Sequence, residues 1–224
     1  MRRLKGWFGE KKTAFIMWLF LNGKSYHRFH NLIIPSKKGS SQIDHLIVSR
    51  QGFFIVETKN LKAWVFGSEH SKYWTQTLFN RKYQFQNPLK QCYRQKKILA
   101  EFLDIEESLI NVVVYFVGES SFKTALPENV IDKGLIRYIR KFQHQVLSDT
   151  ELEETVMLLK VLKSESLISR KDHLLSLKQR HGSKSICPNC GSNLVIRKAK
   201  NGPRTGFEFL GCSSFPKCKF SRNI

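Results

Sequence analysis

Hydrophobic and polar residues follow two different rhythms in the first half of the chain. Residues 42–49 and 53–59 are rich in β-branched and aromatic side chains, and the turn signal Arg50-Gln51-Gly52 separates them, which predicts a β-hairpin. An unbroken apolar run at 111–117 predicts a further, buried strand. Strands that are apolar on both faces favour an α/β domain whose sheet is covered by helices on both sides.

Two helices are predicted around these strands. One covers residues 9–21, and the other starts at Asn87-Pro88 and runs to about Leu103, with the proline suited to a first helical turn. The apolar run 14–21 in the first helix is far shorter than the ~20 residues that span a bilayer. Glu10 and the lack of a small-residue cleavage site argue against a signal peptide. We therefore expect this helix to pack into the core of a cytoplasmic protein.

The second half of the chain divides into a helical block and a cysteine-rich block. Leu152, Val156, Leu159 and Leu162 approximate one helical stripe, and residues 181–185 have the composition of a linker. We predict three parts: a mixed α/β domain over 1–120, a helical segment and linker over 121–183, and a small module over 184–224.

Charge narrows the choice of partners. The 224 residues contain 38 Lys and Arg but only 18 Asp and Glu, a formal net charge of +20. Such a field attracts polyanions, so nucleic acid or an anionic membrane surface leads the partner list, against the alternative of a solvated basic surface without a partner. We favour DNA and expect no membrane association.

The cysteine pattern indicates a metal site. Cys187 and Cys190 form a Cys-x-x-Cys turn, and Cys212 and Cys218 follow after two strand-like runs at 194–197 and 207–210. Two such pairs complete a tetrahedral site for one Zn²⁺ in a hairpin-based ribbon. The alternatives are unpaired thiols or a redox motif, but a redox motif starts a helix, whereas Pro188 and Gly191 form a turn here.

The segment Gly211-Cys212-Ser213-Ser214-Phe215-Pro216-Lys217-Cys218 resembles the C-terminal four-cysteine fingers of bacterial type IA topoisomerases. That resemblance covers most of 186–220 and implies binding to single-stranded DNA. Positive charges would follow phosphates while exposed rings stack on bases, although some rings must cover the ribbon's own core. The candidate contacts are Arg197, Lys198, Lys200, Arg204, Phe207, Phe209, Phe215, Lys217 and Lys219.

A second candidate site lies on the predicted hairpin. Glu57-Thr58-Lys59 alone resembles an ordinary exposed charge pair, but Asp44 changes its meaning. With a two-residue loop at Gln51-Gly52, paired residue numbers sum to 103, so Asp44 lies opposite Lys59 and Glu57 is its diagonal neighbour. A three-residue loop would place Glu57 on the opposite face.

Converging carboxylates suit a hard divalent ion. Mg²⁺ (or Mn²⁺) takes oxygen ligands and keeps several waters, and it could acidify a water for attack on phosphorus. Asp44 and Glu57 would hold the ion, and Lys59 could position the water or stabilise the transition state.

The order of these elements resembles the nuclease-related domain (NERD) family of the PD-(D/E)xK nuclease superfamily. The shared elements are Gly9-Glu10, Gln42-Ile43-Asp44-His45, Glu57-Thr58-Lys59-Asn60 and Asn87-Pro88 with Gln91. The resemblance implies a restriction-endonuclease-like mixed sheet flanked by helices. It also implies Glu10 as an acidic helper, Asp44 and Glu57 as metal ligands, Lys59 as the catalytic lysine and Gln91 as a supporting residue. The chain departs from the family at 61–67, where a glycine-rich stretch is common and only Gly67 is present.

Together these patterns predict a Mg²⁺-dependent DNA nuclease in the cytoplasm, associated with the nucleoid and targeted to single-stranded or branched DNA by the ribbon. Other DNA-processing proteins are possible partners. The alternative is a non-catalytic DNA-binding protein that keeps the nuclease fold as a scaffold. We expect His45 to point away from the metal residues, Cys92 to be a buried thiol, and Tyr73-Trp74 to be a possible DNA contact.

Overall fold

A computed structural model describes residues 2–36, 39–79, 81–165, 170–203 and 205–224. Its main feature is a five-stranded mixed sheet in which the first two pairings are antiparallel and the last two are parallel. In sheet order the strands are β1 (His27–Ser36), β2 (Gly39–Ser49), β3 (Gly52–Lys59), β7 (Ile110–Phe116) and β9 (Val130–Ile131). The hairpin and the buried strand near 111–117 are thus confirmed, whereas β1 was not predicted.

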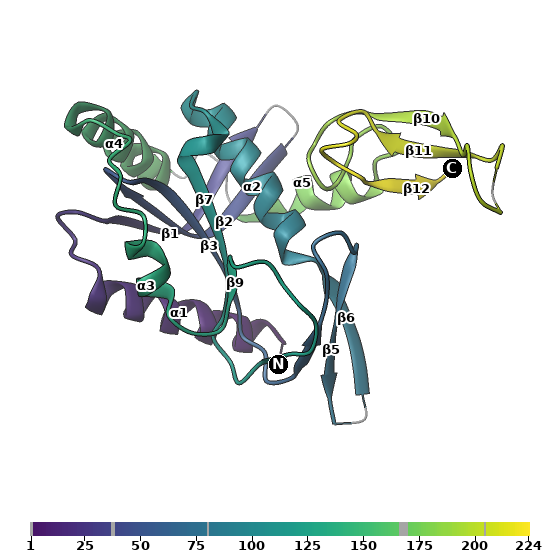
Figure 1. Cartoon of the computed structure of the whole chain (residues 1–224). Helices are drawn as coiled ribbons and strands as arrows, with labels where there is room; N and C mark the ends of the chain where they lie inside the picture. The colour runs from purple at the N-terminus through teal and green to yellow at the C-terminus, as the bar shows by residue number, and fades with distance from the viewer. Residues whose placement is uncertain (1, 37–38, 80, 166–169, 204) are drawn as a thin grey trace.

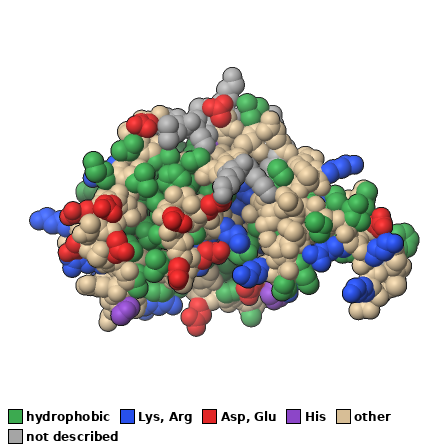
Figure 2. Space-filling view, turned by 90° about the horizontal axis from the view of Figure 1, so that it is seen from above, with side chains coloured by type: hydrophobic (Ala, Val, Ile, Leu, Met, Phe, Trp, Pro, Cys, Tyr) green, Lys and Arg blue, Asp and Glu red, His purple; other side chains and the backbone are tan. Residues whose placement is uncertain are grey.

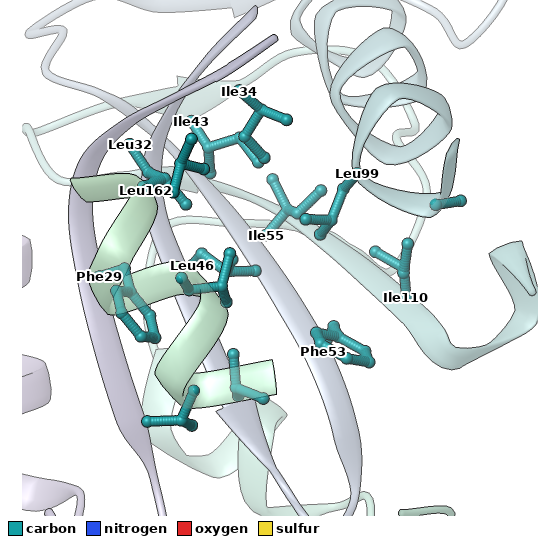
Figure 3. Close-up of a cluster of buried hydrophobic side chains, with 14 of the residues drawn as sticks. Phe29, Leu32, Ile34, Ile43, Leu46, Phe53, Ile55, Leu99, Ile110 and Leu162 are labelled. Atoms are coloured by element: carbon teal, nitrogen blue, oxygen red, sulfur yellow. The ribbon is translucent and has the colours of Figure 1, made fainter. Parts of the chain in front are cut away.

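Helices cover both faces of this sheet (Figure 1). One face packs against α2 (Pro88–Leu103) and α4 (Asp149–Glu165), and the core there includes Leu46, Phe53, Leu99 and Leu162 (Figure 3). The opposite face packs against α1 (Arg2–Phe20) and α3 (Leu135–Arg140) through a second cluster that contains Met17 and Phe54. The predicted mixed α/β architecture, with a mixed sheet between helices, is therefore confirmed.

Helix α1 packs against the core, as expected, but through one side alone. Only one side of it is buried, chiefly at Met17, while Trp18 is 64% exposed and Phe15 is 59% exposed. The apolar run therefore wraps around the helix instead of following its buried stripe. No helix in the described residues is long and apolar enough to cross a membrane.

Helix α2 has the predicted bounds, and its start is fixed by Asn87. The Asn87 side chain accepts a hydrogen bond from the Leu89 backbone N–H (3.0 Å), as an N-cap residue does. Its amide group donates to the backbone oxygens of Ser68, Glu69 and Ser71 over 2.8–3.1 Å. A buried asparagine thus fixes the N-terminal end of α2 to the loop before β5.

A second sheet, which the hydrophobic pattern did not predict, lies beside the first. It has the order β6-β5-β4-β8, formed by β4 (Trp64–Phe66), β5 (Tyr73–Leu78), β6 (Arg81–Gln86) and β8 (Ser121–Phe122). Trp74 is fully buried and stacks on Phe116 of the main sheet, with ring planes 5° apart. Trp74 therefore belongs to the core and joins the two sheets, which removes it as a possible DNA contact.

The segment after β7 is largely helical, as predicted, and the four leucine and valine residues of the α4 stripe are all buried. Within this segment α5 covers Arg170–Gly182, while a short 3-10 helix at Glu107–Leu109 lies directly before β7. His173 of α5 is buried, and its Nδ1 lies 2.7 Å from Ser40 Oγ on β2. This contact places α5 beside the end of β2 that carries Asp44.

The C-terminal module is a three-stranded sheet of β10 (Leu194–Lys198), β11 (Glu208–Cys212) and β12 (Ser221–Asn223). Its two longer strands confirm the predicted hairpin, and β12 is an addition. Its core packs against Tyr93 of α2, so the module is docked on the first domain (Figure 1). On the face shown in Figure 2, Lys and Arg side chains lie on the ribbon and elsewhere, while most Asp and Glu side chains lie away from the ribbon.

Candidate active site and metal centre

Asp44 lies where β2 and β3 separate. The pairing of these strands runs from Ser49–Gly52 to His45–Val56 and stops there. Beyond that point the Thr58 backbone N–H donates to Asp44 Oδ2 (3.1 Å). The Asp44 carboxylate thus accepts a hydrogen bond from a backbone N–H that is no longer paired with β2. This bond holds Asp44 beside the end of β3.

The hairpin register differs from the predicted one by two residues. The loop is Arg50-Gln51 and paired numbers sum to 101, so Asp44 extends the register toward Glu57 and not toward Lys59. Side chains alternate with a period of two, and a shift of two therefore leaves every residue on its expected face. The predicted convergence survived because the loop still has an even number of residues.

Strand β2 is irregular beside Asp44. Ile43, Leu46 and Val48 all belong to one core cluster, although a regular strand would put Ile43 on the face opposite Leu46. On the neighbouring β1, Asn31 adopts a positive φ of 54°. Strands that bend in this way re-aim side chains near functional sites. His45 points to the other face, as expected, and its Nδ1 lies 2.8 Å from that of His30.

Glu57 is the centre of a polar network from two elements. It is 2% exposed, and its Oε1 accepts from Lys59 Nζ at 2.5 Å. Its Oε2 accepts from Gln91 Nε2 (2.7 Å) and from Gln95 Nε2 (2.9 Å), both on α2. Gln91 Oε1 in turn accepts from Lys59 Nζ (3.3 Å). The four side chains therefore fix one another, and α2 determines where Glu57 and Lys59 lie.

Charges in this cluster perturb one another strongly. Burial and the nearby Glu57 carboxylate raise the pKa of Asp44 well above its usual range, against the opposing effect of Lys59. Burial alone would lower the pKa of Lys59, but Glu57 and Asp44 outweigh it and the pKa is raised. Lys59 is therefore an ammonium ion, and the two carboxylates repel each other.

Glu10 contributes to this field from the other side of the sheet. Its charge is a further cause of the raised pKa of Asp44, which places the α1 carboxylate near the cluster. Close packing fixes this part of α1, because a Cβ atom built on Gly9 would lie 2.6 Å from Asn60 Cβ. Cys92 is buried nearby, and burial followed by the Glu57 charge raises the pKa of its thiol well above the usual range.

The donor set fits a divalent ion with oxygen ligands. Neighbouring carboxylates are a common arrangement at Mg²⁺ sites, because the cation offsets the repulsion between them. Asp44 and Gln91 also line a cavity of about 310 Å³ that opens beside them. A phosphate could therefore approach the cluster from this side.

Four cysteines form the second candidate site. Their sulfurs all lie within 4.8 Å of one another, and Cys187–Cys218 and Cys190–Cys212 are separated by 3.7 and 3.3 Å. Tetrahedral zinc with Zn–S bonds of ~2.3 Å requires sulfurs about 3.8 Å apart. All four residues are buried and none forms a disulfide, so the cluster fits Zn²⁺.

Arg94 supplies an independent sign that this cluster is anionic. It is 5% exposed, and its three guanidinium nitrogens have no hydrogen-bond partner among the described residues. Its Nη1 lies against the first cysteine turn, 2.9 Å from a Cβ atom built on Gly191. A zinc ion with four thiolates carries a net charge of −2, which such a buried cation would balance.

The candidate DNA contacts of the ribbon have different surroundings. Phe207 and Phe215 are 68% and 57% exposed, Phe209 is half-buried, and Phe220 is in the ribbon's core. Arg197 lies over the Phe215 ring at 5.6 Å, and Lys198 is 3.7 Å from Glu208. Lys200, Lys217 and Lys219 are exposed, while Arg204 lies outside the described residues.

Sequence reasoning missed two residues that belong to these sites. Gln95 holds Glu57 and also donates to the Gln42 backbone oxygen (2.9 Å). Its spacing from Gln91, one helical turn, could have indicated it. Arg94 gave no signal, because its role depends on the docking of the ribbon.

Comparison with known proteins gives two matches. The nuclease-related domain family matches residues 5–117, and the topoisomerase DNA binding C4 zinc finger family matches 184–224. The uncharacterized protein pXO1-01 of Bacillus anthracis is 37% identical over 112 residues, 50% of this chain and 52% of that protein. This chain thus spans about half the length of that relative.

The ribbon has relatives of its own. DNA topoisomerase 1 of Campylobacter jejuni is 53% identical over 38 residues, 17% of this chain and 5% of the topoisomerase. The uncharacterized protein YrdD of Escherichia coli is also 53% identical over 38 residues, 17% of this chain and 18% of that protein. No solved structure matches the chain.

Proposed function

Because the chain belongs to the nuclease-related domain family and carries a topoisomerase-type zinc ribbon, we propose that it is a metal-dependent DNA nuclease. The observation that carries the proposal is the convergence of Asp44, Glu57 and Lys59 beside a cavity, with Glu57 and Lys59 fixed by Gln91. Such a cluster has the parts that phosphodiester hydrolysis requires.

The residues take complementary roles in this proposal. Asp44 and Glu57 would hold Mg²⁺ or Mn²⁺, which supplies an acidified water and shields charge on the phosphate. Lys59 is charged, and its ammonium group would stabilise the negative charge that develops on the phosphate oxygens. Gln91 and Gln95 keep Glu57 in place, and Glu10 adds negative charge near Asp44.

The ribbon would bring the enzyme to DNA. The turns of the ribbon present exposed Phe207 and Phe215 together with several lysines, a combination suited to stacking on unpaired bases and following phosphates. Single-stranded or branched DNA exposes such bases, and we therefore propose it as the preferred substrate.

A plasmid-nicking assay tests the proposal. We expect cleavage with Mg²⁺ or Mn²⁺, none with EDTA, and a loss of at least about 10²–10³-fold in Lys59→Met and Glu57→Gln, the effect of removing one transition-state stabiliser. Circular dichroism should show both variants folded. Wild-type rates in both would exclude this site, and DNA binding without any cleavage would identify the non-catalytic scaffold instead.

A further inference from the structure

Two neighbouring cavities lie between the ribbon and the first domain. The cavity of about 310 Å³ beside Asp44 has a wall formed by Pro188 and Asn189 of the first cysteine turn. A second cavity of about 160 Å³ lies between the β5–β6 hairpin and the ribbon, and it is lined by the same two residues. Gln86 lines both as well, so the two cavities are neighbours with a shared wall, and we call the pair the ribbon groove.

The outer part of the ribbon groove is basic and aromatic. Lys72 Nζ lies 5.3 Å from the centre of the Tyr73 ring and 5.6 Å from that of Phe220. Phe220 is buried in the ribbon core, whereas Tyr73 is 48% exposed and offers a free ring surface. Arg222 lines the same cavity.

The inner part leads to the candidate active site. Lys90 and Arg94 line it, and Asp44 is the one acidic residue among the lining residues of either cavity. A path with cations along its length and a carboxylate at its end suits a phosphate backbone that meets a metal ion at one point. The hairpin on one side and the cysteine turn on the other restrict its width.

We propose that the ribbon groove is the path of a single DNA strand into the active site. Phosphates lie along Lys72, Arg222 and Lys90, one base stacks on Tyr73, and the scissile phosphate reaches Asp44. Bases in a duplex are already stacked and paired, so only an unpaired strand can offer a base to Tyr73. The zinc ribbon is then one wall of the substrate path as well as a binding module. This inference rests on the proposed nuclease function.

The test measures binding apart from cleavage. The affinity of a fluorescent oligothymidylate is measured with Ca²⁺ in place of Mg²⁺, for the wild type, Tyr73→Ala and Trp64→Ala. Trp64 is a matched control, because it is exposed, carries Lys123 over its ring at 4.7 Å, and lines neither cavity. We expect Tyr73→Ala to weaken binding by about 5- to 150-fold, the loss of one base stack, and Trp64→Ala to change it less than twofold.

Other outcomes separate this inference from the proposed function. Two outcomes would overturn the proposed strand path even if the protein cleaves DNA. One is an equal effect of the two substitutions, and the other is tighter binding of a hairpin duplex than of the single strand. A Tyr73 effect in a protein without metal-dependent cleavage would support the groove and overturn the nuclease.

The isolated charge of Arg94 carries a second, independent inference. Arg94 lies on α2 between Gln91 and Gln95, which hold Glu57, and its guanidinium group lies against Gly191 of the first cysteine turn. We infer that Arg94 is the charge partner of the zinc site and fixes the ribbon to α2. Arg94 also lines the inner cavity of the ribbon groove, but it has no hydrogen bond to the Glu57 network among the described residues. In this inference it is a positioning residue, because it acts on the ribbon through the zinc site.

Zinc release tests this role. The rate at which a chromogenic chelator removes zinc is compared for the wild type, Arg94→Lys, Arg94→Met and the control Lys97→Met. Lys97 is on the same helix but pairs with Glu107 (3.6 Å). We expect Arg94→Met to release zinc about 10- to 100-fold faster, as loss of an outer-shell partner does. Arg94→Lys should be intermediate and Lys97→Met unchanged.

The Co²⁺-substituted protein gives a second readout, since a change in the charge beside the thiolates shifts their charge-transfer absorption. Equal release rates and spectra in the wild type and Arg94→Met would overturn the inference. If Arg94→Met does not fold, Arg94→Lys decides, and wild-type release in that variant together with an unshifted spectrum would also overturn it.

Discussion

The Asp44–Glu57 cluster lies at the edge of a large hydrophobic core, whereas the four cysteines are themselves most of the core of the ribbon. Seventeen buried residues form the cluster that supports β2, β3 and α2, and none of them is a proposed ligand. In the ribbon, four of the seven residues in the hydrophobic cluster are cysteines. The first site is therefore preformed by packing, and the second is formed by its metal.

This difference explains why the first domain can tolerate repulsion between Asp44 and Glu57 without a metal, whereas the ribbon cannot tolerate repulsion among its four thiolates. A core that is stable without metal can hold two carboxylates together at some cost in stability. Such destabilising arrangements are typical of functional sites. A small ribbon has no such reserve, so its sulfurs require the ion. Metal removal should consequently abolish activity in the first region and abolish structure in the second.

The largest expected effect is on the ribbon. We expect Cys187→Ser to lose its zinc and unfold the ribbon, because structural zinc contributes ~10–16 kcal/mol in small modules. Cys92→Ser should retain one zinc per chain, since Cys92 is buried in the first domain. Elemental analysis measures the zinc, and equal contents in wild type and Cys187→Ser would refute the assignment.

A smaller effect is expected in the preformed network. Gln91→Ala removes a donor to Glu57 and an acceptor from Lys59, and a hydrogen bond to a charged group is worth about 1.5–3 kcal/mol. The maximal cleavage rate should fall by roughly 10- to 150-fold with little change in the DNA concentration for half-maximal rate. Gln84→Ala, at an exposed site on β6, is the control and should keep the wild-type rate. A wild-type rate in Gln91→Ala would show that the network is not functional.

The smallest effect concerns acid stability of the first domain. Burial lowers the pKa of His45 to about 3, and burial with nearby lysine and arginine charges lowers that of His30 to about 4. Unfolded histidines bind protons below about pH 6.5, so folding stability is lost as the pH falls from 6.5 toward 4. His45→Leu should reduce this loss by about 2 kcal/mol at pH 4.5.

Urea unfolding between pH 7 and 4.5 measures this difference. His144→Leu, at an exposed site, should follow the wild type, and protonation of the cysteines affects all three proteins alike. The same pH dependence in His45→Leu and the wild type would contradict the account of the buried pair.

Local patterns predicted the elements that carry the candidate active site. The bounds of α2 followed from Asn87-Pro88 and the helical period, and the hairpin followed from two apolar runs around a turn signal. The predicted β2–β3 register was wrong by two residues. Because side chains alternate with a period of two, Asp44, Glu57 and Lys59 still lie on one face. The cysteine spacing predicted the metal cluster, because two pairs across a hairpin leave few alternatives.

Tertiary contacts determined the rest. The strands β5 and β6 are polar over much of their length and join the core chiefly through Trp74, so their pattern gave no signal of a second sheet. The apolar run of α1 indicated packing into the core but not which side is buried, and only one stripe of the helix meets the sheet. The ribbon groove and the isolated charge of Arg94 exist only because two distant segments dock.

The most direct measurement is the thermal midpoint of the wild type and Asp44→Asn as Mn²⁺ is added. Without metal, Asp44→Asn removes the cost of burying the Asp44 carboxylate and its repulsion by Glu57, so its midpoint should be higher by about 2–4 °C, equivalent to ~1 kcal/mol. Mn²⁺ at about 100 times its dissociation constant should stabilise the wild type by about 2.7 kcal/mol and leave the variant unchanged. Asp44→Asn should also fail to cleave DNA, so the same substitution should raise stability and abolish activity. Equal stabilisation of both proteins by Mn²⁺, or cleavage by Asp44→Asn, would contradict the account.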